Sequence, residues 1–142
     1  MMGLLRHPWV VTGCRVGIAV VFIVAGLAKI GDAESFARQV HNFQLIPVAF
    51  ENLVAIVLPW IEVVIGVTML VGSRRRAGAW LSLILMAGFT IAVAAGVARG
   101  LDIECGCFGT GDGARVGAVK LIENVLLTLA AWIGTTRLGQ ED

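Results

Sequence analysis

Four apolar segments, each about as long as a bilayer is thick, constrain this chain more than any other feature. A transmembrane helix needs about 20 mainly apolar residues, and such segments lie at about 9–28, 52–72, 77–98 and 116–135. Of the 142 residues, 58% are hydrophobic and 15% are charged, against about 45–50% and about 25% in an average soluble domain. The sequence therefore predicts one integral membrane domain over residues 1–142, an all-α bundle of four transmembrane helices.

The first segment has one feature of a signal peptide, because Gly26-Leu27-Ala28 resembles a cleavage site of small residues. Arg15 interrupts the apolar region that a signal peptide requires, and cleavage would leave an odd number of spans. We therefore expect this segment to stay in the protein as its first transmembrane helix.

Basic residues predict the orientation of the bundle. Arg74-Arg75-Arg76 form the turn between the second and third segments, and lysine and arginine in short loops favour the cytoplasmic side. Both termini are then cytoplasmic, and the loop at 100–115 is extracytoplasmic. Arg99 and Arg115 flank that loop and oppose this orientation, but the triple arginine is the stronger signal. We expect a multi-pass protein of the plasma or inner membrane.

The residues between the first two segments predict a short helix. Phe36, Val40 and Phe43 recur at helical spacing among polar residues between Asp32 and Phe43. This pattern is typical of an amphipathic helix that lies on the membrane interface. We expect this helix to cap the bundle, with a substrate-binding lid as the alternative.

The pentapeptide Cys105-Gly106-Cys107-Phe108-Gly109 lies in the predicted outer loop. Two thiols one residue apart can close a very small disulfide ring, and Gly106 gives the backbone the freedom that such a ring needs. Because misfit stores strain, a bridge this tight should be easily reduced. Cys105 and Cys107 are therefore candidate catalytic thiols, with Phe108 as an apolar lip.

The neighbours of the three cysteines predict different behaviour for each of them. The negative charge of Glu104 disfavours the thiolate form of the adjacent Cys105, so Cys107 should be the stronger nucleophile. Cys14 lies near the cytoplasmic end of the first segment, far from this pair. A lone cysteine in an apolar helix usually acts as a small hydrophobe, and we expect Cys14 to be inert.

Ionisable residues inside the apolar segments are costly and therefore informative. Glu62 lies near the middle of the second segment, and Arg15 lies in the cytoplasmic half of the first. Their depths put Glu62 within reach of the long guanidinium arm of Arg15, so we expect Glu62 to face away from lipid and to pair with Arg15 or with another buried polar residue. Such a pair would either fix helix packing or handle protons.

A second group of polar residues lies in the outer half of the bundle. Lys29 closes the first segment, while Lys120 and Glu123 share one face of the fourth. Glu123 is expected to pair either with Lys29 across the bundle or with Lys120 along its own helix. Asn124 is a further polar group for hydrogen bonds between helices or to a carbonyl ligand. Either pairing puts charge beneath the cysteine loop, where Lys29 and Lys120 would favour thiolates.

These residues together resemble a known family. Arg15-x-x-x-Ala19, Ala25-Gly26-Leu27-Ala28-Lys29, Pro59-x-x-Glu62-x-x-x-Gly66 and the Cys-Gly-Cys-Phe-Gly loop are similar to the MauE branch of the DoxX-like membrane proteins. The resemblance covers essentially the whole chain, although Glu123 stands where many relatives carry a basic residue. It implies a four-helix membrane bundle, a redox-associated role for Cys105 and Cys107, and a part in disulfide formation or maturation of exported proteins. A thioredoxin-like partner fits that role.

Three classes of function remain open. The first is a thiol–disulfide oxidoreductase that exchanges disulfides or electrons with an exported or thioredoxin-like protein. The second is a membrane protein that handles a soft metal such as Cu(I), with the two thiolates joined by His41, Asp102 or Glu104. The third is a structural subunit of a redox complex, in which the bridge only stiffens the loop.

The sequence says less about cofactors and partners. It identifies no cofactor and no metal ligand set, and it does not name the electron acceptor, for which a quinone is an open alternative. No basic stripe predicts binding to nucleic acid. The bilayer is the expected surrounding of the chain, and its oligomeric state stays open.

Overall fold

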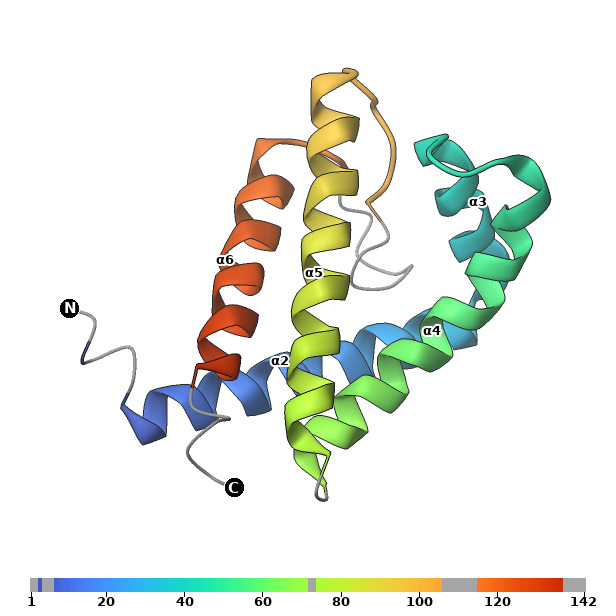
Figure 1. The fold of residues 1–142 in the computed structure, drawn as a ribbon. Coiled ribbons are helices and arrows are strands. Elements are labelled where there is room, and N and C mark those ends of the chain that lie inside the picture. Colours follow the sequence, from blue (N-terminus) through green and yellow to red (C-terminus); the bar gives the residue numbers. More distant parts are fainter. Residues whose placement is uncertain (1–2, 4–6, 72–73, 106–114, 137–142) are drawn as a thin grey trace.

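The structure is a computed structural model that describes residues 3, 7–71, 74–105 and 115–136. Its helices are α2 (Pro8–Gly31), α3 (Ala33–Phe43), α4 (Val48–Leu70), α5 (Arg75–Ala98) and α6 (Ala118–Thr135) (Figure 1). Four of them, α2, α4, α5 and α6, are long and apolar enough to cross a membrane. The predicted all-α bundle of four long helices with a short helix after the first is therefore confirmed, with helix ends shifted by a few residues.

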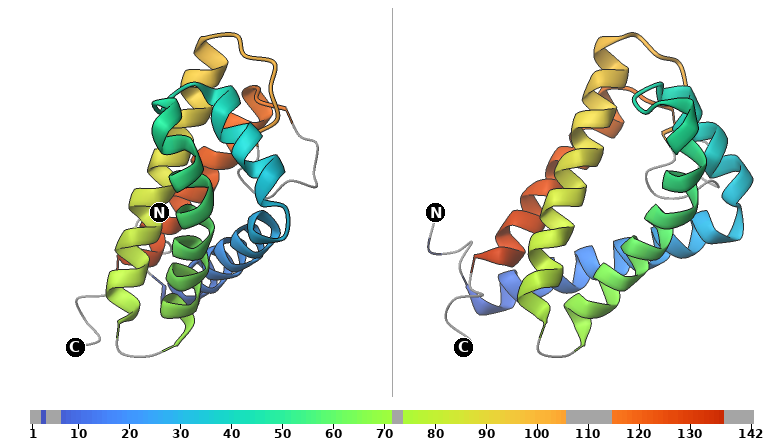
Figure 2. Two further views of the ribbon diagram at one scale, coloured as in Figure 1. Left: turned by 90° about the vertical axis from the view of Figure 1, so that its right-hand side faces the viewer. Right: turned by 45° about the vertical axis from the view of Figure 1, so that its right-hand side comes forward.

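The four long helices form two pairs. The most extensive packing joins α2 to α4 and α5 to α6, while α2–α6 and α4–α5 contacts connect the pairs. Figures 1 and 2 show α5 and α6 running side by side, with α2 crossing near the lower end of both. Each helix therefore contacts at least two others, as a bundle requires.

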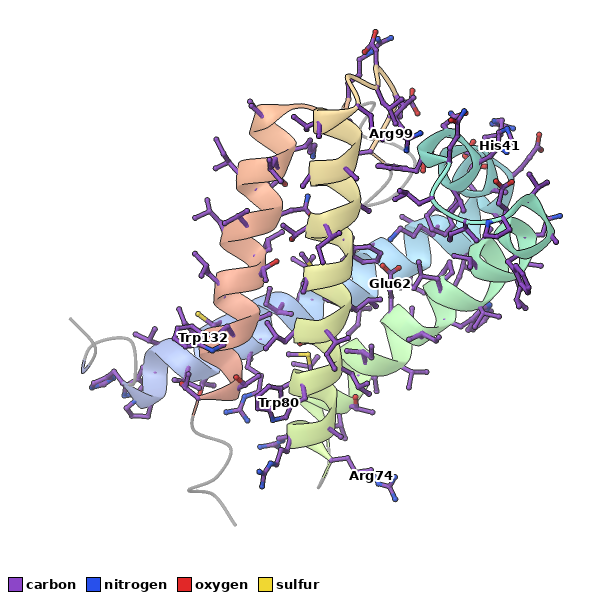
Figure 3. All side chains as sticks on the ribbon, turned by 45° about the horizontal axis from the view of Figure 1, so that its top comes forward. His41, Glu62, Arg74, Trp80, Arg99 and Trp132 are labelled. Atoms are coloured by element: carbon purple, nitrogen blue, oxygen red, sulfur yellow. The ribbon has the colours of Figure 1, made fainter. Side chains whose placement is uncertain are left out.

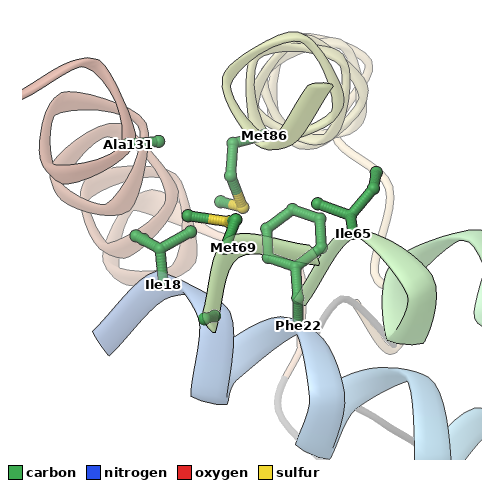
Figure 4. Packing of buried hydrophobic residues seen from close by; sticks show 7 residues of the cluster. Ile18, Phe22, Ile65, Met69, Met86 and Ala131 are labelled. Atoms are coloured by element: carbon green, nitrogen blue, oxygen red, sulfur yellow. The ribbon is translucent and has the colours of Figure 1, made fainter. Parts of the chain in front are cut away.

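A compact apolar core holds the two pairs together. Figure 4 shows its side chains converging from all four long helices. The cluster consists of Ile18, Ala19, Phe22, Ile65, Met69, Met86 and Ala131. Met69 and Met86 are unbranched and flexible, so they fill the irregular space between helices that cross at different angles.

Two glycines set the register between α2 and α4. A Cβ atom on Gly26 would lie 2.7 Å from the carbonyl oxygen of Pro59, and one on Gly66 would lie 2.7 Å from that of Ala19. Both distances are shorter than real Cβ contacts, so only glycine permits this approach of the two backbones. The register of the pair is therefore fixed at two points along its length.

Apolar side chains cover much of the outer surface. Large hydrophobic residues are exposed on all four long helices, among them Val24 and Leu27 on α2, Ile56 and Trp60 on α4, Ile84 and Ile91 on α5, and Leu126 and Leu129 on α6. A soluble monomer rarely exposes so large an apolar surface, whereas a bilayer requires one. The outer faces are those of a membrane-embedded bundle.

The short helix α3 has defined ends. The Asp32 side chain accepts a hydrogen bond from the backbone N–H of Ser35 at 3.2 Å, which caps its N-terminus. Gln44 takes a left-handed conformation with φ of 51° and ends the helix. Phe36 and Gln39 are buried, and α3 packs mainly on α4.

Arg99, just after α5, ties the end of α3 to the other helix pair. Its guanidinium donates to the carbonyl oxygen of Phe43 at 2.7 Å and to Oε1 of Gln44 at 3.2 Å. Carbonyl groups in the last turn of a helix lack partners within the helix. Arg99 therefore satisfies one of them and holds α3 against α5.

Candidate functional site

A buried ion pair joins α2 to α4. Lys29 Nζ lies 2.6 Å from Oε1 of Glu62, and the two side chains are only 0% and 2% exposed. The ammonium group also lies 5.1 Å from the ring centroid of Phe36 and 5.0 Å from that of Phe89, within range of a cation–π interaction. Oε2 of Glu62 is buried and has no hydrogen-bond partner among the described residues. Figure 3 shows Glu62 between the two ends of the bundle.

Glu62 is buried and has a buried polar partner, as predicted, but this partner is Lys29 and not Arg15. The helix register explains why. A Cβ on Gly26 would lie 3.2 Å from Cβ of Glu62, so these two positions are level. Arg15 precedes Gly26 by about 16 Å along α2 at the rise of an α-helix, which is too far for its side chain. Lys29 follows Gly26 by less than one turn and lies on the same face. Arg15 is also buried, but beside Gly134 near the end of α6.

The polar residues of α6 pair along their own helix. Lys120 Nζ lies 3.0 Å from Oε2 of Glu123, so of the two predicted partners Glu123 takes Lys120. The Asn124 side chain is fully buried, and its Nδ2 donates to the carbonyl oxygen of Lys120 at 2.9 Å. Its Oδ1 has no hydrogen-bond partner among the described residues. Both lysines near the cysteine loop thus already face a carboxylate, which weakens the effect expected of them on a thiolate.

A hydrogen bond that the sequence did not reveal links α5 to α6. The hydroxyl groups of Thr90 and Thr128 lie 2.7 Å apart. Each hydroxyl also lies within hydrogen-bond distance of a carbonyl oxygen of its own helix, Thr90 at 2.9 Å from that of Met86 and Thr128 at 2.8 Å from that of Asn124. Because a hydroxyl has a single hydrogen, one threonine donates to the other, which in turn donates to its own carbonyl. Single threonines in apolar segments are a signal for such links, although the sequence does not say which threonines meet.

The loop that carries the cysteines is closed at its base. The backbone N–H of Val116 donates to the carbonyl oxygen of Ile103 at 2.8 Å, and Glu104 and Arg115 form an antiparallel β-bridge. Arg115 also forms an ion pair with Asp102, whose hydrogen bond and negative charge raise the pKa of the guanidinium. The two ends of the loop are therefore held together where Cys105 begins it.

Cys105 lies in a buried position at this base. It is 4% exposed and packs against Val93 of α5. Glu104 beside it accepts a hydrogen bond of 3.4 Å from Nε2 of Gln39, which connects the loop base to α3. Cys107, with Gly106, Phe108 and Gly109, falls outside the described residues, so the pairing of the two thiols stays a prediction. Cys14 carries a free thiol on α2.

A cavity of about 160 Å³ connects Cys105 to the buried ion pair. Cys105 and Lys29 line the same cavity, together with apolar side chains of α3, α4 and α5. Phe36, Val40 and Phe43, predicted as the apolar face of α3, all lie in its wall. Gln39 and Phe89 also line it, although no pattern in the sequence indicates that either belongs to a site.

The residues considered as metal ligands have other partners. Nδ1 of His41 lies 2.9 Å from Oε2 of Glu51, while Asp102 pairs with Arg115 and Glu104 accepts from Gln39. Over the stretches that the structure describes, no three side chains of His, Cys, Asp or Glu gather as a metal site would require. In Figure 3, His41 and Arg99 lie at the end of the bundle opposite Arg74.

Comparison with known proteins identifies relatives along nearly the whole chain. The family model described as "Methylamine utilisation protein MauE" matches residues 7–137. The methylamine utilization protein MauE of Paracoccus denitrificans is 33% identical over 132 residues, which cover 92% of this chain and 71% of the relative. That of Methylorubrum extorquens is 35% identical over 133 residues, covering 93% and 72%.

No solved structure matches the chain. The family model extends over all the helices and the loop between α5 and α6. Together with four helices long enough to cross a bilayer, it identifies a multi-pass membrane protein. The chain belongs to the MauE family of methylamine utilisation proteins.

Proposed function

We propose that this protein is a membrane thiol–disulfide redox protein that serves an exported protein of a methylamine utilisation system. One observation carries the proposal: Cys105 lies at the closed base of its loop, in the wall of a cavity that also contains a fully buried lysine. A cysteine that only stiffened a loop would need neither the cavity nor the charge. We also propose that the MauE family is a branch of the DoxX-like membrane proteins.

The proposed reaction is disulfide exchange. A thiolate of the exported or thioredoxin-like partner attacks one sulfur of the Cys105–Cys107 disulfide, so that a mixed disulfide forms and the internal S–S bond breaks. A second thiolate of the partner then attacks the mixed disulfide. The partner leaves with a new disulfide, and Cys105 and Cys107 are left as two thiols that have gained two electrons and two protons.

We also propose that the termini are cytoplasmic and that the cysteine loop faces the oxidising side of the membrane. Arg74-Arg75-Arg76 support this orientation, because basic residues in short loops favour the cytoplasmic side. A disulfide in the opposite loop would also persist there, outside the cytoplasm. A membrane-impermeant thiol reagent should label reduced Cys105 and Cys107 in intact cells of a Cys14→Ala variant. Labelling only in inverted vesicles would contradict the orientation.

A redox titration tests the function. The Cys105–Cys107 bridge should equilibrate with a glutathione or dithiothreitol series at a more oxidising potential than structural disulfides, which lie below about −300 mV. A midpoint under that value would indicate a bridge that only stiffens the loop.

Trapping the partner gives a second, independent test. A Cys105→Ala or Cys107→Ala chain should accumulate a mixed disulfide with its partner, because the remaining thiol cannot be resolved internally. The Cys14→Ala chain is the matched control and should accumulate none. If neither single variant traps a protein that carries cysteines, the exchange reaction is excluded.

A further inference from the structure

The cavity beside Cys105 has the size of one small ring. Its volume is about 160 Å³, and an apolar cavity of about 150 Å³ in another protein accommodates benzene. Phe36, Phe43 and Phe89 supply three aromatic side chains to its wall. Aromatic pairs are most stable when stacked with an offset or packed edge to face, so these rings favour a flat aromatic or quinoid occupant.

Three polar groups interrupt the apolar wall. Lys29, fully buried, brings an ammonium donor, and Cys105 brings a sulfur atom. Gln39 is 5% exposed, and its buried Oε1 has no hydrogen-bond partner among the residues described. A donor, an acceptor and a redox-active sulfur therefore share one small apolar space. An occupant with a ring oxygen could bond to the donor, and after reduction to a hydroxyl it could also bond to the acceptor.

The cavity reaches the surface that the protein presents to the lipid. Leu45, in the turn between α3 and α4, lines it and is 48% exposed. Val54 and Leu58 of α4 also line it and are half-buried. Their neighbours Leu53 and Ile56 are 57% and 63% exposed on the outer face of α4. A ligand dissolved in the bilayer would thus meet an apolar entrance.

We propose that this cavity binds the ring of a quinone, which reoxidises the Cys105–Cys107 pair. This inference rests on the proposed function, because it supplies the electron acceptor for that exchange. The lining disfavours charged oxidants such as a glutathione disulfide, and the volume is too small for a fused three-ring cofactor. A quinone fits the ring size, carries the carbonyl oxygens and dissolves in the membrane.

The reaction balances. The Cys105 thiolate attacks a ring carbon of the quinone and forms a C–S bond. The Cys107 thiolate then attacks the Cys105 sulfur, so that the S–S bond forms and the C–S bond breaks. Two electrons pass to the ring, and the two protons of the former thiols go to its two oxygens, giving a hydroquinone. Lys29 would donate a hydrogen bond to the oxygen on which negative charge develops.

Photolabelling tests binding separately from chemistry. A photoreactive azidoquinone is added to the full chain in nanodiscs, in a Cys105→Ser/Cys107→Ser variant that cannot react, and labelled peptides are mapped. Labels are expected within residues 36–46 and around residue 89, and a tenfold excess of a short-chain benzoquinone should remove most of them. Labels spread evenly over the lipid-facing helices, or insensitive to competitor, would mean that lipid fills the cavity and would overturn the proposal.

A volume change in the wall provides the matched variant. Phe89→Trp adds atoms inside the cavity, whereas Phe50→Trp makes the same change on a side chain that is 55% exposed. Phe89→Trp should reduce labelling and raise the KM for the quinone at least tenfold, while Phe50→Trp changes neither. Equal behaviour of the two variants would refute the site.

Quinone reduction by the wild-type chain with its thiols reduced completes the test. One hydroquinone should appear for each disulfide formed, and Phe89→Trp should slow this step while exchange with dithiothreitol stays unchanged. Cavity labelling without hydroquinone formation would overturn the electron transfer. If the bridge also titrated as a structural disulfide in the redox series, the proposed function would fail with it. A bridge that titrates as more oxidising than structural disulfides would confine the failure to the quinone.

Discussion

Replacement of Glu62 by glutamine should be far more costly than the same change at Glu34. Glu62→Gln removes the negative partner of Lys29, whose side chain is 0% exposed. Loss of one partner from a buried ion pair typically costs about 3–5 kcal/mol, because the other charge stays buried without compensation. Glutamine keeps an oxygen that can accept from Lys29, so we expect about 3 kcal/mol, a factor of about 10² in the unfolding equilibrium.

Glu34→Gln is the matched control. Glu34 forms the same kind of contact with Arg38, at 2.7 Å, but the two side chains are 87% and 61% exposed. An exposed pair four residues apart on a helix contributes about 0.3–0.5 kcal/mol. The two substitutions are chemically identical, but one removes a buried contact between two helices and the other an exposed contact within one helix, so the difference between them reflects mainly the burial of the first pair.

Equilibrium unfolding in mixed micelles, followed by the fluorescence of the four tryptophans, measures both variants. The double variant Lys29→Met/Glu62→Gln should recover most of the lost stability, because no buried charge remains. Equal losses for Glu62→Gln and Glu34→Gln would refute the reasoning. A double variant as unstable as the sum of its single changes would refute it equally.

Two further predictions concern contacts that position the site. Gly26→Ala should destabilise the protein by about 1–3 kcal/mol, since the new Cβ would lie 2.7 Å from a backbone oxygen of α4; Gly17→Ala, with no atom within 4 Å, should stabilise it slightly in the same unfolding assay. Arg99→Ala should speed hydrogen exchange in residues 33–43, because the end of α3 loses a charge-assisted hydrogen bond worth about 1–2 kcal/mol. Arg38→Ala on the exposed face of α3 is its control, and equal exchange in the two variants would exclude the tie between α3 and α5.

Local sequence patterns were sufficient to predict the helices of this protein. Whether a segment can cross a membrane depends mainly on the hydropathy of its own residues, so four apolar runs were enough to predict four long helices. The periodic Phe36, Val40 and Phe43 predicted α3 in the same local way. The resemblance based on short motifs also predicted the MauE family correctly.

Which polar groups meet depends on how the helices pack, and the sequence did not reveal this. The depth of Arg15 and Glu62 in their segments suggested a pair, but depth along a helix does not give the register between two helices. Gly26 and Gly66 set that register through close backbone contacts, and it brings Lys29 to Glu62 instead.

The cavity was equally beyond the sequence. Its wall combines residues of α2, α3, α4 and α5 with the turn between α3 and α4 and the base of the cysteine loop, and no local pattern encodes a space enclosed by segments so far apart in the sequence. The spacing of apolar residues showed which face of α3 would be buried. It could not show that this face lies opposite Cys105, because that depends on how α3 packs on α4 and on the hydrogen bonds that Arg99 makes with its end.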